Sequence, residues 1–243
     1  MRYLQILLLW HGIVMAAQAQ SPNAALTATL AAHGGAAVQS VKTIELRGTV
    51  VSQDRAPASV VITASLEGQL RVDYGVPVQR TIITTEKGRA EWRGTEAIPK
   101  PPHVGLFSAL DMLSLLGIRR LTDPKVQLSS LGAGTVRNRA TARIKGVTEQ
   151  EQTFYGRKVA DETDVDIDSA TGLVARISRV QYAEQSLDRP FLLSHEFADY
   201  RQVQGILFPF RIDSLIDNRT VDTLTVTSVT VNPALPPTTW EKR

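Results

Sequence analysis

The chain has 243 residues, a formal net charge of +3, no cysteine and an aromatic content of 6%. This small net charge gives no electrostatic footprint for nucleic acid, and the lack of cysteine excludes a disulfide or a thiol nucleophile. The chain is long enough for one sizeable core. Because no repeat, low-complexity run or linker divides it, we expect a single domain over residues 20–243.

Residues 1–19 are predicted to be a secretory signal peptide. Arg2 gives a positive start, the apolar stretch over 4–15 is too short to span a bilayer, and A-Q-A over 17–19 is a small-x-small cleavage site. The alternative, an N-terminal core helix, lacks a capping residue. No cysteine follows, so the chain cannot be lipidated as a bacterial lipoprotein, and no other segment reads as transmembrane. We expect an exported protein that begins near Gln20.

The first half of the domain is predicted to be a helix followed by strands. Residues 24–38 are rich in alanine, with Leu26 and Leu30 four apart, which predicts a helix ending near Gly34-Gly35. Period-two alternation then predicts strands, with Lys87-Gly88 as a hairpin turn. The predicted strands are 41–53, 58–66, 69–76, 80–86 and 89–94.

A second helix is predicted over 103–118, where the period changes to that of a helix. Leu106, Leu110 and Leu113 share one face of it. Strands then resume, and Gly132-Ala133-Gly134 reads as a turn. These strands are 126–130, 135–146, 163–168, 173–182, 191–201, 206–216 and 221–231. The order predicts an α+β, mainly β domain, with one curved antiparallel sheet wrapped over helices.

Several short motifs in these elements resemble the LolA-like family, periplasmic carriers of outer-membrane lipoproteins and their relatives. An H-G-G sequence ends the first helix, a D-x-x-T-G-L turn precedes a D-Y-R-x-V-x-G-I-x-x-P strand pair, and T-x-x-x-V-x-V-N closes the domain. The matching residues are His33, Gly34, Gly35, Val41, Ile44 and Gly48; Asp168, Thr171, Gly172 and Leu173; Asp199, Tyr200, Arg201, Val203, Gly205, Ile206 and Pro209; and Thr227, Val229, Val231 and Asn232.

The resemblance implies an open half-barrel with helices in its concave face, and an apolar space between sheet and helix that receives acyl chains. It implies a periplasmic, monomeric protein of outer membrane biogenesis that carries or senses a lipid or lipoprotein acyl chain, without catalysis or cofactor, and that has an envelope protein as a further partner. In such a half-barrel the helix over 103–118 would lie in the concave mouth. The residues expected to line the apolar pocket are Trp92, Leu106, Phe107, Leu110, Leu113 and Leu116. A dry core made of the same residues is the alternative.

Motifs for metal binding and catalysis fail in this sequence. Asp164, Asp166 and Asp168 have Ser169 and Ala175 where an EF-hand needs glycine and glutamate, so a strand with a solvated acidic face is expected instead. His195-Glu196 begins an H-E-x-x-H pattern, but Asp199 stands in place of the second histidine. There is no serine elbow, S-x-x-K pair or phosphate loop. We predict no metal and no catalysis at His195.

A strictly alternating segment over 136–145 places basic residues on one side of a strand. These are Arg137, Arg139, Arg143 and Lys145. Two interpretations stay open: a solvated outer face whose charges discourage edge pairing, and a docking stripe for an acidic partner or a lipid head group.

Two other functions are compatible with this sequence. One is an envelope-stress regulator that acts through protein contacts; it would be expected to have a second domain, for which this length leaves no room. The other is an enzyme whose residues meet only in three dimensions, which should show buried, clustered titratable groups. A lipid carrier should instead show a continuous apolar cavity.

Overall fold

The computed structural model describes residues 21–53, 55–76, 79–85, 88–98, 113–154, 157–183 and 186–241. These residues form one 13-stranded sheet, in which every pair of neighbouring strands is antiparallel. The strands are β1 (Thr43–Ser52), β2 (Arg55–Ser65), β3 (Leu70–Tyr74), β4 (Arg80–Thr85), β5 (Gly88–Arg93), β6 (Glu96–Ala97), β7 (Gln127–Val136), β8 (Arg139–Phe154), β9 (Arg157–Asp168), β10 (Val174–Ala183), β11 (Ser186–Val203), β12 (Ile206–Ile216) and β13 (Arg219–Val231).

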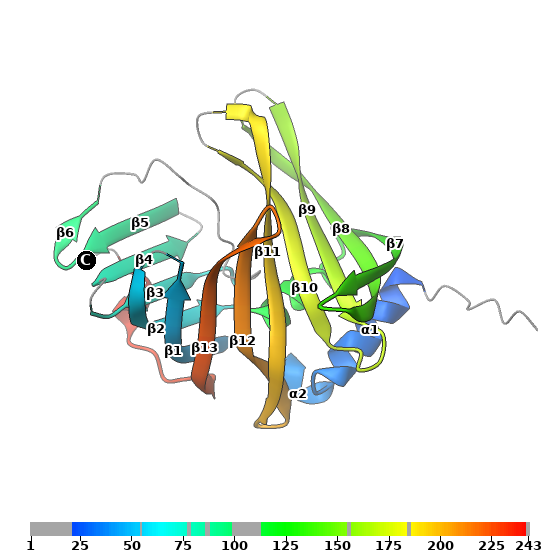
Figure 1. The fold of residues 1–243 in the computed structure, drawn as a ribbon, viewed down its shortest axis with the longest axis horizontal. Helices are drawn as coiled ribbons and strands as arrows, with labels where there is room; N and C mark the ends of the chain where they lie inside the picture. The colour runs from blue at the N-terminus through cyan, green and yellow to red at the C-terminus, as the bar shows by residue number, and fades with distance from the viewer. Residues whose placement is uncertain are drawn as a thin grey trace, which may run out of the picture.

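The sheet consists of two meanders that meet at its middle. Its strand order is β6-β5-β4-β3-β2-β1-β13-β12-β11-β10-β9-β8-β7, so the first and last strands lie side by side. β6 and β7 are the two edges, and the sheet does not close on itself. Figure 1 shows the strong twist along this order, with β4 to β6 at one end of the molecule and β7 to β10 at the other. The predicted mainly β, open antiparallel architecture is confirmed.

The helices are short and differ in part from those predicted. They are α1 (Pro22–Ala32), α2 (Ala36–Gln39), α4 (Ser114–Arg120) and the 3-10 turn η1 (Pro237–Trp240). The single helix expected over 24–38 is divided, because the chain leaves helical geometry at Gly34 (φ 135°) and Gly35 (φ 55°). Of the helix expected over 103–118, residues 103–112 lie outside the described residues, and α4 ends at Arg120. None of the helices in the described ranges is long and apolar enough to cross a membrane.

The turn expected at Gly132-Ala133-Gly134 is wrong. These residues belong to β7, which has an irregular register between Ser130 and Gly132. The chain reverses instead at Arg137 (φ 49°) and Asn138 (φ 61°). Two successive residues with positive φ are what a tight hairpin turn requires, and asparagine tolerates this geometry well. The alternating charges on both sides of this turn conceal it in the sequence.

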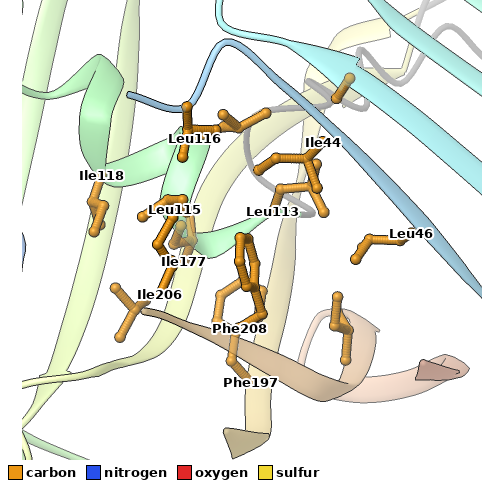
Figure 2. Close-up of a cluster of buried hydrophobic side chains, with 14 of the residues drawn as sticks. Ile44, Leu46, Leu113, Leu115, Leu116, Ile118, Ile177, Phe197, Ile206 and Phe208 are labelled. Carbon is orange, nitrogen blue, oxygen red and sulfur yellow. The ribbon is translucent and has the colours of Figure 1, made fainter. Parts of the chain in front are cut away.

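One apolar cluster joins the sheet to the helices. α4 contacts β10 and β12, and α1 contacts α4. Figure 2 shows Leu113, Leu115 and Leu116 pointing toward Ile44, Ile177 and other side chains of the sheet. The cluster also contains Leu46, Val60, Ile62, Ile144, Val165, Phe197, Ile206, Phe208 and Ile212. Burial of so many large aliphatic side chains provides the main stabilisation of a chain without disulfides.

Candidate functional site

A cavity of about 410 Å³ lies on one face of the sheet beside this apolar cluster. Strands β1 to β4 provide one part of its wall, and β12 and β13 provide the other. The apolar lining residues are Val50, Ala56, Ala58, Leu70, Val72, Ile82, Ile216, Val221 and Leu224. The polar ones are Ser52, Gln53, Arg55, Tyr74, Arg80, Thr84, Ser214 and Asp222.

The register of the strands explains why these residues share one face. Val50 pairs with both Ala58 and Leu224, and Val72 pairs with Ile82. Directly opposed residues in antiparallel strands point to the same side of a sheet, and alternate residues along each strand do the same. The result is an apolar floor that continues the face occupied elsewhere by the core cluster.

Charged and polar groups border this floor. Arg80 forms an ion pair with Glu91, which is buried with 5% of its surface exposed. On the other side, the Ser52 hydroxyl donates a hydrogen bond of 2.5 Å to Asp222 Oδ1. Arg55, at the start of β2, is exposed. The cavity therefore combines a large apolar surface with polar groups at its border, as a site for an amphiphilic molecule requires.

His195 lies behind this border on β11. Its Nδ1 is 3.1 Å from Ser214 Oγ, and Ser214 lines the cavity. Burial lowers the pKa of His195 from its ordinary value of 6.5 to about 4, so the ring is neutral at pH 7. As expected for a strand, Glu196 points to the opposite face, where it pairs with Arg137. Within the described ranges, no three His, Asp or Glu side chains form a group that could hold a metal ion.

The residues predicted to line an apolar pocket are not brought together where the structure describes them. Leu106, Phe107 and Leu110 lie outside the described residues. Leu113 and Leu116 belong to the core cluster, in which Leu116 is completely buried. Trp92 is buried on β5 and pairs with Thr81. Thr81 and its neighbour Ile82 point to opposite faces of the sheet, and Ile82 lines the cavity, so Trp92 faces away from it.

The observed floor was missed because alternation in one strand shows which residues share a face, but not which part of that face stays uncovered. The one local signal is Ala58, a small residue in line with larger aliphatic ones. A small side chain at the centre of an apolar face leaves space, yet it can equally admit a neighbouring side chain.

The four predicted stripe residues form ion pairs within the sheet. Arg137 reaches Glu196 and Asp213, and Arg139 contacts Asp168 at 2.8 Å. The other pairs join Arg143 to Asp164 and Asp166, and Lys145 to Glu162 and Asp164. The hydrogen bond to Glu162 raises the pKa of Lys145, which stays protonated. Docking of a partner by this stripe stays a prediction, and such a partner would compete with the sheet's own carboxylates.

Asp166 and Asp168 on β9 are buried, so the expected solvated acidic face is wrong for these two residues, whereas Asp164 keeps 25% of its side chain exposed. Asp166 is 1% exposed and accepts hydrogen bonds from Thr141 and Arg176. Asp168 is 3% exposed, and its Oδ1 accepts hydrogen bonds from the Thr171 hydroxyl and amide. These bonds hold the pKa of Asp168 below its usual value although its burial acts in the opposite direction. Long arginine side chains can cover carboxylates that strand alternation places on an outer face.

The motif residues have structural roles close to α1. His33 is fully buried; Val174 N–H donates to its Nε2 at 3.3 Å, which leaves Nδ1 to donate to the Leu207 carbonyl at 3.0 Å. Burial lowers the pKa of His33 to about 4, which agrees with this neutral tautomer. Tyr200 packs edge-on against His33, at 5.4 Å between ring centres, and its hydroxyl donates to the Val174 carbonyl. The H-G-G and D-Y-R motifs thus join α1 to β10 and β12.

Asn232, the last residue of the closing motif, joins the two ends of the domain. Its Oδ1 accepts hydrogen bonds from the amides of Lys42 and Thr43, and its Nδ2 donates to the Ser40 carbonyl. These bonds fix the start of β1 beside the end of β13. Asn232 therefore has a structural role in the fold.

Comparison with solved structures identifies the fold. A LolA superfamily protein from Nitrosomonas europaea superposes with a TM-score of 0.54 at 12% sequence identity, over 92% of this chain and 99% of that one. A DUF1329 family protein from Desulfovibrio piger gives 0.56 at 11% identity, over 91% and 98%. A Vibrio parahaemolyticus domain described as an outer membrane lipoprotein-sorting protein gives 0.52 at 10% identity, over 82% and 89%.

The chain has a LolA-like fold. This agrees with the motifs in the sequence, and the superpositions extend over nearly the whole domain. Neither protein-family models nor curated protein sequences show a match to this chain. At identities of 10–12% the superpositions define the architecture alone, so the function has to be argued from the cavity.

Proposed function

We propose that this chain is a periplasmic binding protein that carries or senses a lipid or lipoprotein acyl chain in the cavity between β1–β4 and β12–β13, without catalysis or cofactor. The observation that carries the proposal is the cavity of about 410 Å³ with its apolar floor. Sites for small molecules typically enclose about 300–1,000 Å³. Each methylene group transferred there from water contributes about 0.8 kcal/mol.

Two further features support this function. An acyl chain needs apolar surface without dense hydrogen bonding, and the floor formed by Val50, Ala58, Val72 and Leu224 is of this kind. Solved structures with the same architecture include a LolA superfamily protein and a lipoprotein-sorting domain. A part of Leu106, Phe107 and Leu110 in binding the acyl chain stays a proposal, because these residues lie outside the described residues. The predicted signal peptide over 1–19 would direct the chain to the periplasm.

Uptake of a neutral fluorescent acyl probe, a pyrene-labelled methyl ester, tests the proposal. Ala58→Trp should fill the cavity and weaken probe binding at least tenfold, because Ala58 lines the floor directly opposite Val50. Val180→Trp is the matched control, because Val180 is 49% exposed on β10 and does not line the cavity. Absence of uptake by the unmodified protein would contradict the proposal. Native mass spectrometry of protein purified from its own periplasm should show a co-purifying lipid.

A further inference from the structure

A row of four polar residues on adjacent strands crosses the inner face at the border of the cavity. Ser52 on β1 pairs in register with Asp222 on β13, Asp222 pairs with Ser214 on β12, and Ser214 pairs with His195 on β11. Ser52, Asp222 and Ser214 all line the cavity. Since directly opposed residues point to the same side of a sheet, the four side chains form a continuous polar row on adjacent strands.

The hydrogen bond from Ser52 does not use all the acceptor positions of Asp222. An ionised aspartate only accepts, and its two oxygens have about four acceptor positions. Within the described residues, Asp222 accepts one side-chain hydrogen bond, the one from Ser52. His195, neutral and 1% exposed, uses Nδ1 for Ser214. The carboxylate of Asp222 is therefore available to a hydrogen-bond donor in the cavity.

The charges around the cavity also disfavour an anion beside this row. Arg80 is paired with the buried Glu91. Arg55 pairs in register with Ser52 at the end of the β1–β2 hairpin, but it is exposed there, so water and salt screen its charge. A carboxylate head group placed against the row would meet the negative charge of Asp222 in a partly buried position.

We infer that the polar row selects the head group of the bound amphiphile, and that it favours a neutral end that donates hydrogen bonds, such as the hydroxyls of a monoacylglycerol, over a fatty-acid carboxylate. This inference rests on the proposed function, because the acyl chain itself must occupy the apolar floor. The hydroxyl of such a ligand donates to Asp222, and Ser214 can donate to or accept from a second hydroxyl.

Displacement of the pyrene-labelled methyl ester by three unlabelled competitors tests the inference. Monopalmitoylglycerol donates hydrogen bonds, methyl palmitate only accepts them, and palmitate at pH 8 is an anion, while all three share one acyl chain. Monopalmitoylglycerol should displace the probe at concentrations at least tenfold lower than palmitate, with the ester between them, because hydrogen bonds to a charged group are among the stronger ones. Equal displacement by all three would overturn the inference and leave the proposed function in place. No probe uptake at all would overturn both.

Asp222→Asn provides the second measurement, because the amide can donate as well as accept. The preference for monopalmitoylglycerol over palmitate should fall at least tenfold in this variant, whereas Ser214→Ala should reduce it less. Asp199→Asn is the matched control: Asp199 is exposed at the end of β11, pairs with Arg201 and does not line the cavity. A preference that is unchanged in a folded Asp222→Asn protein would contradict the inference. If this variant does not fold, the competitor ranking on the unmodified protein still decides.

Discussion

The two halves of this sheet use the same kind of surface in different ways. From β8 to β12, the inner face packs against α1 and α4, and the motif histidine His33 fastens the helices to the strands. From β1 to β4, the face continues with similar aliphatic residues but borders a cavity. The H-G-G and D-Y-R motifs are in the filled half, and most of the candidate site is in the hollow half. Sequence signals that identify a fold can therefore be remote from the residues that bind a ligand.

The largest expected difference between the halves is in their tolerance of a buried charge. Leu116→Glu places a carboxylate in the filled core, where Leu116 is completely buried, and should cost roughly 4 kcal/mol or more or prevent folding. Val50→Glu places the same group on the partly exposed cavity floor and should cost less than about 1 kcal/mol. Urea unfolding measures both values. Equal losses would show that the cavity is as closed as the core.

The second effect is a loss of stability in mild acid. Burial lowers the pKa of His33 and of His195 from 6.5 to about 4, so between these values the unfolded chain binds protons that the folded chain does not. Their contribution to stability is complete above pH 6.5 and is lost as the pH falls towards 4, by roughly 3 kcal/mol for each histidine. Urea unfolding between pH 7.5 and 4 gives the slope of the unfolding free energy against pH, which is proportional to the number of protons taken up on unfolding. His33→Gln and His195→Gln should each lower that number by about one. If the slope of the unfolding free energy against pH is unchanged in one of these variants, that histidine binds its proton in the folded state as readily as in the unfolded state.

A smaller effect is expected from a methyl group at the junction of α1 and β12. A Cβ at Gly34 would lie 2.5 Å from the Gly205 carbonyl oxygen, in a backbone with φ of +135°, so Gly34→Ala should cost roughly 2–3 kcal/mol. Gly68→Ala is the control, because Gly68 also has positive φ but nothing within 4 Å of its Cβ. It should cost about 1 kcal/mol, from backbone strain alone. Thermal unfolding of the two variants separates steric conflict from strain.

The smallest effect concerns the ion pairs on the outer face. Arg176→Met removes one partner of Asp166, which is 1% exposed but keeps Thr141 and Arg143, so a loss of about 1–2 kcal/mol is expected. Arg47→Met, which breaks a pair between more exposed groups on β1, should change stability little. Urea unfolding at low and high salt checks both. If Arg176→Met destabilises the protein as little as Arg47→Met does, water screens the ion pairs on the outer face as effectively as it screens the exposed pair on β1.

The sequence predicts the architecture well because strands and turns are local. Alternation locates the strands, and the short motifs that resemble the LolA-like family indicate the fold; in the structure His33 of the H-G-G motif packs against Tyr200 of the D-Y-R motif. The strand ends are less well predicted: β8 and β11 continue beyond 146 and 201, because pairing with a neighbouring strand sets where a strand ends.

The candidate site could not be predicted in the same way, because it depends on non-local arrangement. The polar row of Ser52, Asp222, Ser214 and His195 comes from four strands, and their register becomes known only when the sheet is assembled. Likewise, Trp92 is an obvious pocket candidate by residue type, but its position in β5 turns it to the other face. Alternation along a strand shows which residues share a face, but tertiary packing decides which of the two faces borders the cavity.

The central pairing of β1 with β13 also has a consequence for how the chain reaches its native state. Each meander can form from neighbours in the sequence, but their junction joins residues from opposite ends of the domain. Closing so long a loop is slow, and it cannot occur before β13 has been synthesised. A chain truncated before Arg219 would leave β1 and β12 as long, unpaired edges. Such edges are templates for aggregation, so the last strand protects the two strands beside it.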